Sequence, residues 1–115
     1  MSRVGDIART GLMAADARIA TSAHNVANVN TPGFTASRLV TQEARDGGVT
    51  YRPGTTELPS PGYGRDGRPT ASAPSDTDLA QETVEQITAS AAFKASLSLL
   101  KTNDELQRSV LSIKA

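Results

Sequence analysis

Residues 25–34 read Asn-Val-Ala-Asn-Val-Asn-Thr-Pro-Gly-Phe, and they end a helical pattern and turn the chain. Thr31 precedes a proline, which disfavours the helical backbone region, and Pro32 fixes its own φ. Gly33 can adopt the positive φ that the third residue of a type II turn requires. Phe34 is one of four aromatic residues in the chain and is expected to pin this turn to an apolar neighbour. The pattern predicts that a helix ends here and that the chain then changes direction.

The residues before this turn, from about 3 to 29, have the pattern of an amphipathic helix. Small and apolar residues recur at alternating spacings of four and three, which is a heptad seam and predicts a partner helix. Frequent alanines along the same segment allow that partner to approach closely. The residues of this seam are Ala8, Leu12, Ala15, Ile19, Ser22, Val26 and Val29.

A second helix is predicted near the C-terminus. Asp78 followed three residues later by Gln81 approximates a capping box, and the pattern continues to about Lys114. Its apolar residues form two neighbouring stripes, so we expect one stripe to face the chain's own N-terminal helix and the other to face a neighbouring subunit. The first stripe holds Ala92, Ser96, Leu99, Asn103, Leu106, Val110 and Ile113, and the second holds Phe93, Leu97, Leu100 and Leu111.

The middle of the chain, residues 36–75, contains six of the nine glycines and five of the six prolines. Short extended segments around Leu39-Val40 and Val49-Thr50-Tyr51 could form at most a small hairpin. From Leu58 to Pro74 we expect a polar connector without regular structure. The predicted fold is therefore mainly α, with long N- and C-terminal helices pairing as a coiled coil around a short irregular or small β-hairpin middle. Its three segments are residues 1–35, 36–75 and 76–115.

Composition limits what this chain can be. Leu, Ile, Val and Phe make up about a fifth of 115 residues, and they concentrate on helical stripes, so we infer one domain that completes its core by assembling. Twelve basic and twelve acidic residues cancel, which argues against nucleic acid as a partner. The absence of cysteine excludes disulfides and thiolate metal sites. We also see no apolar run of membrane-spanning length and no cleavable signal peptide.

No group of residues predicts catalysis or cofactor binding. His24 is the only histidine, so one chain cannot supply a two-histidine metal site. Ser22, His24 and Asp16 could be drawn as a triad, but no nucleophile-elbow motif accompanies them. The carboxylates Glu82 and Glu85 are expected on exposed helix positions. We expect no enzyme activity, cofactor or metal.

Two further features of the polar sequence bear on chemistry. Residues 62–67, Gly-Tyr-Gly-Arg-Asp-Gly, lack the ending of a phosphate-binding loop and do not open a helix. Asn28 and Asn30 fit helix termination and turn capping. For Asn25, hydrogen bonding across subunits and a structural role within the chain are about equally favoured.

The two ends of the chain resemble one known family. Residues 25–34 look like the N-terminal signature of bacterial flagellar axial proteins, which comprise rod, hook and hook-associated subunits. Residues 78–87 resemble the opening of that family's C-terminal helix, and residues 92–96 and 100–106 resemble its continuation. These matches cover roughly the first and last 38 residues. The short middle leaves no room for the larger β domain of the distal rod or hook, so the chain is most similar to a small proximal rod protein.

The resemblance implies a structural subunit of the flagellar basal-body rod, which polymerises through its terminal helices into a torque-transmitting tube across the periplasm. It implies export by the flagellar type III apparatus without a cleavable signal, and it implies copies of itself and other rod subunits as partners, with no membrane insertion. Alternatives are a cytoplasmic helical adaptor of the export apparatus or a divergent rod or hook paralogue. The residues predicted for the assembly interface are Leu12, Ile19, Asn25, Val26, Asn28, Pro32, Gly33, Phe34, Val84, Ile87, Phe93, Leu97, Leu99, Leu100, Leu106, Val110 and Ile113.

Overall fold

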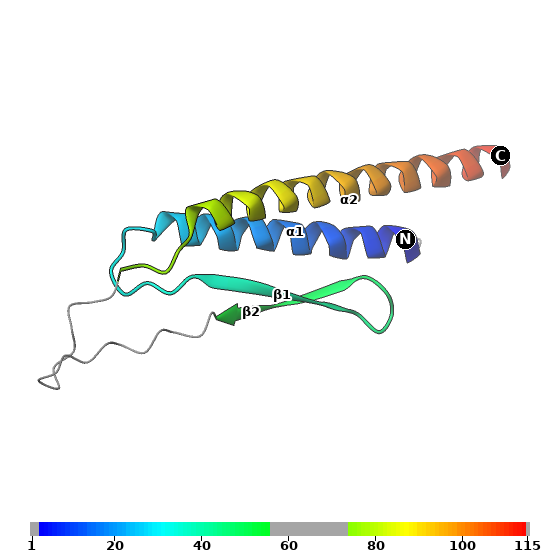
Figure 1. Cartoon of the computed structure of the whole chain (residues 1–115). Coiled ribbons are helices and arrows are strands. Elements are labelled where there is room, and N and C mark those ends of the chain that lie inside the picture. The colour runs from blue at the N-terminus through cyan, green and yellow to red at the C-terminus, as the bar shows by residue number, and fades with distance from the viewer. Residues whose placement is uncertain (1–2, 56–73, 115) are drawn as a thin grey trace, which may run out of the picture.

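Two long helices and one hairpin make up the fold in a computed structural model that describes residues 3–55 and 74–114. The elements are α1 (Arg3–Ala27), β1 (Ser37–Glu43), β2 (Val49–Thr55) and α2 (Leu79–Lys114). The helices lie side by side and run in opposite directions, and the hairpin lies along α1 (Figure 1). This confirms the predicted mainly helical fold with a small hairpin between the paired helices. The predicted connector from Leu58 to Pro74 falls, apart from its last residue, outside the described residues.

Small side chains allow the two helices to pack closely. A Cβ added to Gly11 of α1 would lie 2.8 Å from Ser96 Oγ of α2, so the backbones approach as near as glycine allows. Among the residues that the structure describes, the buried apolar ones are all alanines, namely Ala8, Ala14, Ala15, Ala36 and Ala89. Alanine buries little apolar area, so this core contributes less hydrophobic stabilisation than one built from leucine or isoleucine.

The helix α2 continues past the first residue of α1 (Figure 1). Gly5 and Asn103 are the last buried residues toward this end of the helix pair, and beyond Asn103 only Gln107 is half-buried. We call residues 104–114 the α2 overhang. At 1.5 Å per residue it is roughly 16 Å long.

The hairpin is held against α1 at its loop. Its strands pair antiparallel from Ser37 opposite Thr55 to Glu43 opposite Val49. The hydroxyl of Thr10 accepts a hydrogen bond from the Val49 amide at 3.0 Å and donates one to the Ile7 carbonyl at 2.7 Å. Because an isolated two-stranded sheet is marginally stable in water, this attachment to α1 supports the hairpin.

The turn after α1 has the geometry predicted for Thr31-Pro32-Gly33-Phe34. The Phe34 amide donates to the Thr31 carbonyl at 3.2 Å, and Gly33 has a φ of 75°. The Phe34 ring contacts the His24 ring edge-on, with centroids 5.5 Å apart. The turn is therefore held against the last turn of α1, where the aromatic neighbour of Phe34 is His24.

We expect Gly33→Val to lower the free energy of unfolding by about 2 kcal/mol and Pro32→Ala by about 1 kcal/mol or less. A Cβ at Gly33 would meet nothing within 4 Å, so the cost comes from the positive φ and not from a clash. Urea denaturation of the two variants measures the difference. Gly33→Asn is the control, because asparagine tolerates this backbone region better than valine. Equal losses for Gly33→Val and Gly33→Asn would contradict this explanation.

Candidate assembly surface

A polar cluster joins both helices to the hairpin. We call Ser22, Asn25, Ser37, Arg38 and Glu82 the Asn25 junction. The Asn25 amide nitrogen donates to the Ser37 carbonyl at 2.8 Å and to Glu82 Oε1 at 3.1 Å, while its oxygen accepts from the Ser37 amide at 2.9 Å. One fully buried side chain thus binds α1, β1 and α2 together. Both amide N–H groups of Asn25 and its oxygen thus bond within the chain, which favours a structural role for this residue.

Glu82 corrects the prediction of an exposed carboxylate, because its side chain is fully buried. Glu82 lies seven residues before the buried Ala89 and so shares the face of α2 that meets α1. Arg38 of the hairpin pairs with its Oε1. Burial raises the pKa of Glu82, but the hydrogen bonds from Arg38, Ser22 and Asn25 outweigh it, so the net pKa lies below its ordinary value. Glu85, also predicted to be exposed, is half-buried and paired with Arg18 at 2.6 Å.

The start of α2 is fixed by capping and by contacts to the chain leaving α1. Asp78 Oδ1 accepts from the amides of Ala80 at 2.9 Å and Gln81 at 3.3 Å, which confirms it as the N-cap. The Gln81 side chain accepts from Arg38 at 2.6 Å, in place of the reciprocal bond of a capping box. Asp76 Oδ1 accepts from the Ala36 amide at 2.5 Å. These bonds set where α2 begins relative to α1.

We expect the Asn25 junction to make the stability of the fold depend on pH. Because the pKa of Glu82 is lowered on folding, the unfolded chain binds the proton more readily, so ionised Glu82 stabilises the fold above the ordinary carboxyl pKa. That contribution is lost as the pH falls through the lowered pKa, below about pH 4. We expect Glu82→Gln to be less stable than the parent near neutral pH and to lose less stability on acidification. Urea unfolding between about pH 7 and pH 3 measures both trends. Parallel pH profiles for the two chains would contradict the assignment.

The predicted interface residues fall into two groups. One group lies within or against the chain's own packing. Leu12, Ile19, Val26, Asn28, Phe34, Phe93, Leu97 and Leu100 are half-buried, and Asn25 is buried. The second group is open to solvent and consists of Pro32, Gly33, Val84, Ile87, Leu99, Leu106, Val110 and Ile113.

The first predicted stripe of α2 does not stay on one face of the structure. Asn103 is buried and Ala92 and Ser96 are half-buried, whereas Leu99 and Leu106 are 47% and 61% exposed. A 4-3 spacing averages 3.5 residues per turn, so on a straight helix the stripe drifts by about 20° per heptad away from the partner. This drift places Leu99 and Leu106 at the edge of the contact between the helices. Leu106 also lies in the α2 overhang, beyond the last buried residue of the pair.

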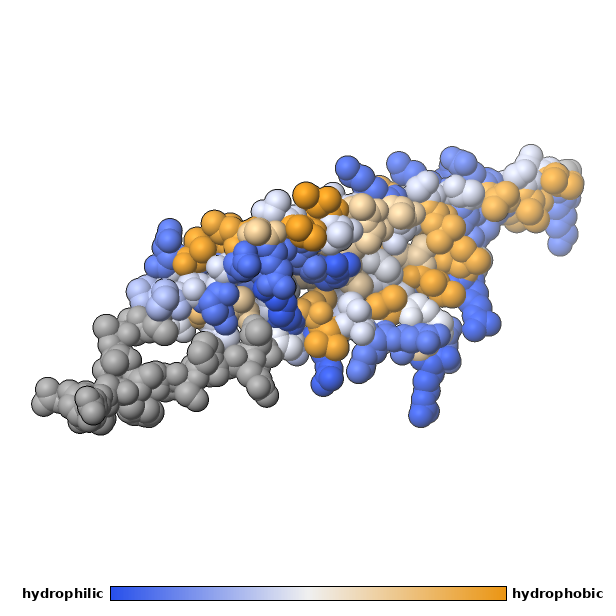
Figure 2. Space-filling view, in the orientation of Figure 1, coloured by the Kyte–Doolittle hydropathy of each residue, from blue (hydrophilic) through white to orange (hydrophobic). Residues whose placement is uncertain are grey.

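Apart from Leu79 and Leu99, the large exposed apolar residues of α2 gather in two places. Val84 and Ile87, 61% and 64% exposed, lie on the side of the helix away from Ala89 and α1. The α2 overhang carries the other group, and apolar side chains reach the end of the helix in Figure 2. Its large exposed apolar residues are Leu106, Val110, Leu111 and Ile113. A soluble domain seldom leaves such residues together without a partner, so both places are candidate assembly surfaces.

Several important residues were missed from the sequence. Arg38 and Glu82 carry no local signal for the junction, since each contributes to it through a partner from another element. Ser22 was predicted on the seam of α1, but its hydrogen bond to the Glu82 carbonyl was not. Val4, Met13 and Leu79 are exposed apolar residues at 47%, 52% and 51%. Their apolar character was visible in the sequence, but periodicity alone could not tell that nothing in the described chain covers them.

A comparison with known protein families finds a match in the N-terminal part of the chain. Residues 6–35 match the family model described as flagella basal body rod protein. The matched segment contains most of α1 and the whole turn through Phe34. The match supports a relationship to the flagellar rod family and a role as a component of the flagellar basal-body rod. None of the curated proteins matches the chain. Within the described residues, neither helix is long and apolar enough to cross a membrane.

Proposed function

We propose, from the rod-family match at residues 6–35, that this chain is a structural subunit of the flagellar rod. It polymerises through its terminal helices into the axial tube that transmits torque, beside copies of itself and other rod subunits. The observation that carries the proposal is the exposed apolar surface of α2, in a chain whose buried apolar residues, over the described ranges, are alanines. Such a chain gains hydrophobic stabilisation mainly by meeting neighbours.

Approximate energies support assembly through this surface. Full burial of one leucine, isoleucine or valine side chain contributes about 1.5–3 kcal/mol. Leu106, Val110 and Ile113 are each more than 60% exposed, so each still has most of that contribution to gain. Contacts repeated with several neighbours in a tube would add these contributions for every subunit.

Export follows from the same proposal. The subunit leaves the cytoplasm through the flagellar type III apparatus and takes its place in the periplasm-spanning rod, with a structural and non-catalytic role and without inserting into the membrane. Its thin alanine core supports this route, because a chain that contributes little apolar burial is easier to unfold for passage.

Deletion of the gene, combined with fractionation of the cells, tests the proposal against the adaptor alternative. We expect the deletion strain to stop swimming and to lack complete rods, and the parent strain to hold the chain outside the cytoplasm. Disabling the export apparatus should trap the chain inside the cell. An adaptor would stay in the cytoplasm of the parent strain, and that result would overturn the proposal.

A further inference from the structure

Two contacts, one at each end, hold the hairpin against the helix pair. We call the first the loop contact, where Gly47 and Val49 meet α1. A Cβ added to Gly47 would lie 3.2 Å from Ile7 Cδ1, and the Val49 amide donates to Thr10 Oγ1 at 3.0 Å. None of residues 44–49 is buried. The loop contact therefore consists of a close backbone approach and one hydrogen bond to a side chain.

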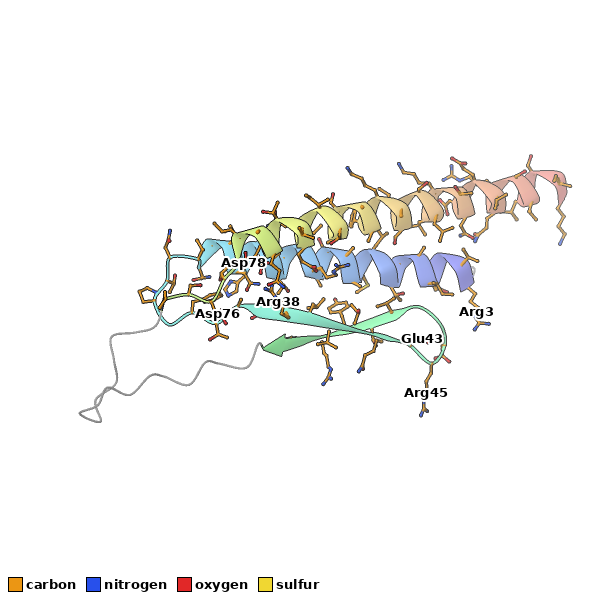
Figure 3. All side chains as sticks on the ribbon, in the orientation of Figure 1. Arg3, Arg38, Glu43, Arg45, Asp76 and Asp78 are labelled. Carbon is orange, nitrogen blue, oxygen red and sulfur yellow. The ribbon has the colours of Figure 1, made fainter. Side chains whose placement is uncertain are left out.

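Polar bonds make the second contact, which we call the root contact. The Asn25 side chain of α1 bonds both the amide and the carbonyl of Ser37. Arg38, the next residue, reaches α2 and pairs with Glu82. In Figure 3, Arg38 lies between the start of β1 and the helices, whereas Arg45 at the loop points away from them. The Arg38 side chain is 32% exposed, so water competes for the bonds that it makes.

Between these two contacts the hairpin packs loosely. None of residues 37–54 is buried, and Val40 and Tyr51 are 38% and 40% exposed. A cavity of about 90 Å³ lies between the start of the hairpin and the helices, and its lining includes Ser37, Arg38, Leu39, Arg18, Thr21 and Glu85. Closure of the hairpin therefore gains little from apolar burial and depends on the hydrogen bonds of the two contacts.

The seam between the two helices, by contrast, is closed along its length. Ser22 Oγ of α1 donates to the Glu82 carbonyl of α2 at 3.2 Å, which places this face of α1 against α2. The helix pair thus holds buried residues all along its contact, where the hairpin holds none. These residues recur every seven positions, at Ala8, Ala15 and Ser22 of α1 and, with the half-buried Ser96 included, at Glu82, Ala89, Ser96 and Asn103 of α2.

The hairpin covers a second face of α1. Ile7, Ala14 and Thr21 are seven residues apart, so they lie along one side of the helix. Ile7 meets the hairpin at Gly47, and Thr21 lines the cavity at the other end of the hairpin. Ala14 lies between them and is 5% exposed. It is therefore buried under the hairpin, whereas its neighbour Ala15 lies on the face that meets α2.

From these features we propose that the hairpin is a strap that opens as a unit while the helix pair stays closed. Opening breaks the loop contact and the root contact and uncovers the face of α1 around Ala14. The closed strap keeps that face from neighbouring molecules. A region held by few hydrogen bonds opens at a lower free energy than the whole fold. The strap is a property of the single chain, so it goes beyond the rod assignment and is tested apart from it.

Thiol labelling of the purified full-length chain tests the strap, because the chain contains no cysteine. We expect Ala14→Cys to react with iodoacetamide about tenfold or more faster than Ala15→Cys, under native conditions in which closing outpaces labelling. The two positions are adjacent and are 5% and 2% exposed, so they differ chiefly in the element that covers them. Equal rates would show that strap and helices open together and would overturn the proposal.

Thr10→Val gives the test a second arm. It removes the hydroxyl that binds the Val49 amide and keeps nearly the same side-chain volume. We expect it to raise the labelling rate of Ala14→Cys about fivefold, the effect of losing one hydrogen bond, and to leave that of Ala15→Cys unchanged. An equal rise at both positions would contradict opening of the strap alone.

Hydrogen exchange of the parent chain, followed by mass spectrometry, decides the question if a cysteine disturbs the packing. We expect the amides of residues 38–54 to exchange about tenfold or more faster than those of residues 85–100. The first segment belongs to the hairpin and the second to the part of α2 that packs on α1. Equal protection of the two segments would overturn the proposal.

Discussion

Asn25→Ala is expected to lower the free energy of unfolding by about 2–4 kcal/mol, the largest loss among the substitutions considered for the isolated chain. Removal of this amide leaves the Ser37 amide and carbonyl without their side-chain partner, and it takes one hydrogen bond from the buried Glu82. A buried polar group without a partner costs about 1–3 kcal/mol. Urea denaturation followed by circular dichroism measures the change.

Asn28→Ala is the matched control, since it removes the same side chain one turn further along. The Asn28 amide donates to the His24 carbonyl at 2.9 Å in an exposed setting, so its loss should cost about 1 kcal/mol or less. Equal losses for the two variants would contradict the central place of the Asn25 junction in joining helices and hairpin.

Leu106→Asp is expected to block assembly while leaving the folded monomer almost unchanged. Leu106 is 61% exposed, so the isolated chain tolerates a charge there. In an assembled rod the carboxylate would be buried without a partner, which costs several kcal/mol in every subunit. Swimming, extracellular recovery of the chain and its unfolding curve together measure the effect.

Ser112→Asp is the control for this substitution. Ser112 is exposed on the same stretch of helix but lies about 120° around the axis from Leu106. We expect Ser112→Asp to swim normally. Normal swimming by Leu106→Asp would show that the exposed stripe of α2 is not an assembly surface, whereas a poorly folded monomer would show that Leu106 supports the chain's own fold.

Features determined by neighbours in the sequence could be predicted. The turn at Gly33 and the N-cap at Asp78 follow from backbone preferences and side-chain chemistry within four residues, and the structure confirms both. The heptad seam of α1 likewise predicted a partner helix, and α2 covers it. The hairpin was recognisable from two short extended segments separated by glycines.

Features that depend on distant elements could not be predicted. In the sequence, Glu82 resembles a solvated charge in the first turn of a helix. It is buried and paired only because Arg38 of the hairpin and Asn25 of α1 both bind its Oε1. The choice of stripe on α2 also escaped prediction. It depends on where α1 begins and on the drift of a heptad pattern around a straight helix, which together leave Leu106 exposed.

The most direct test of the assignment is the location of this chain in purified basal bodies. Quantitative mass spectrometry of intact basal bodies, with electron cryo-microscopy of the rod, measures both presence and position. We predict the chain in the wall of the rod, in several copies per basal body, with the pair of α1 and α2 visible as two adjacent helices. Absence of the chain from basal bodies that contain complete rods would contradict its role as a rod subunit.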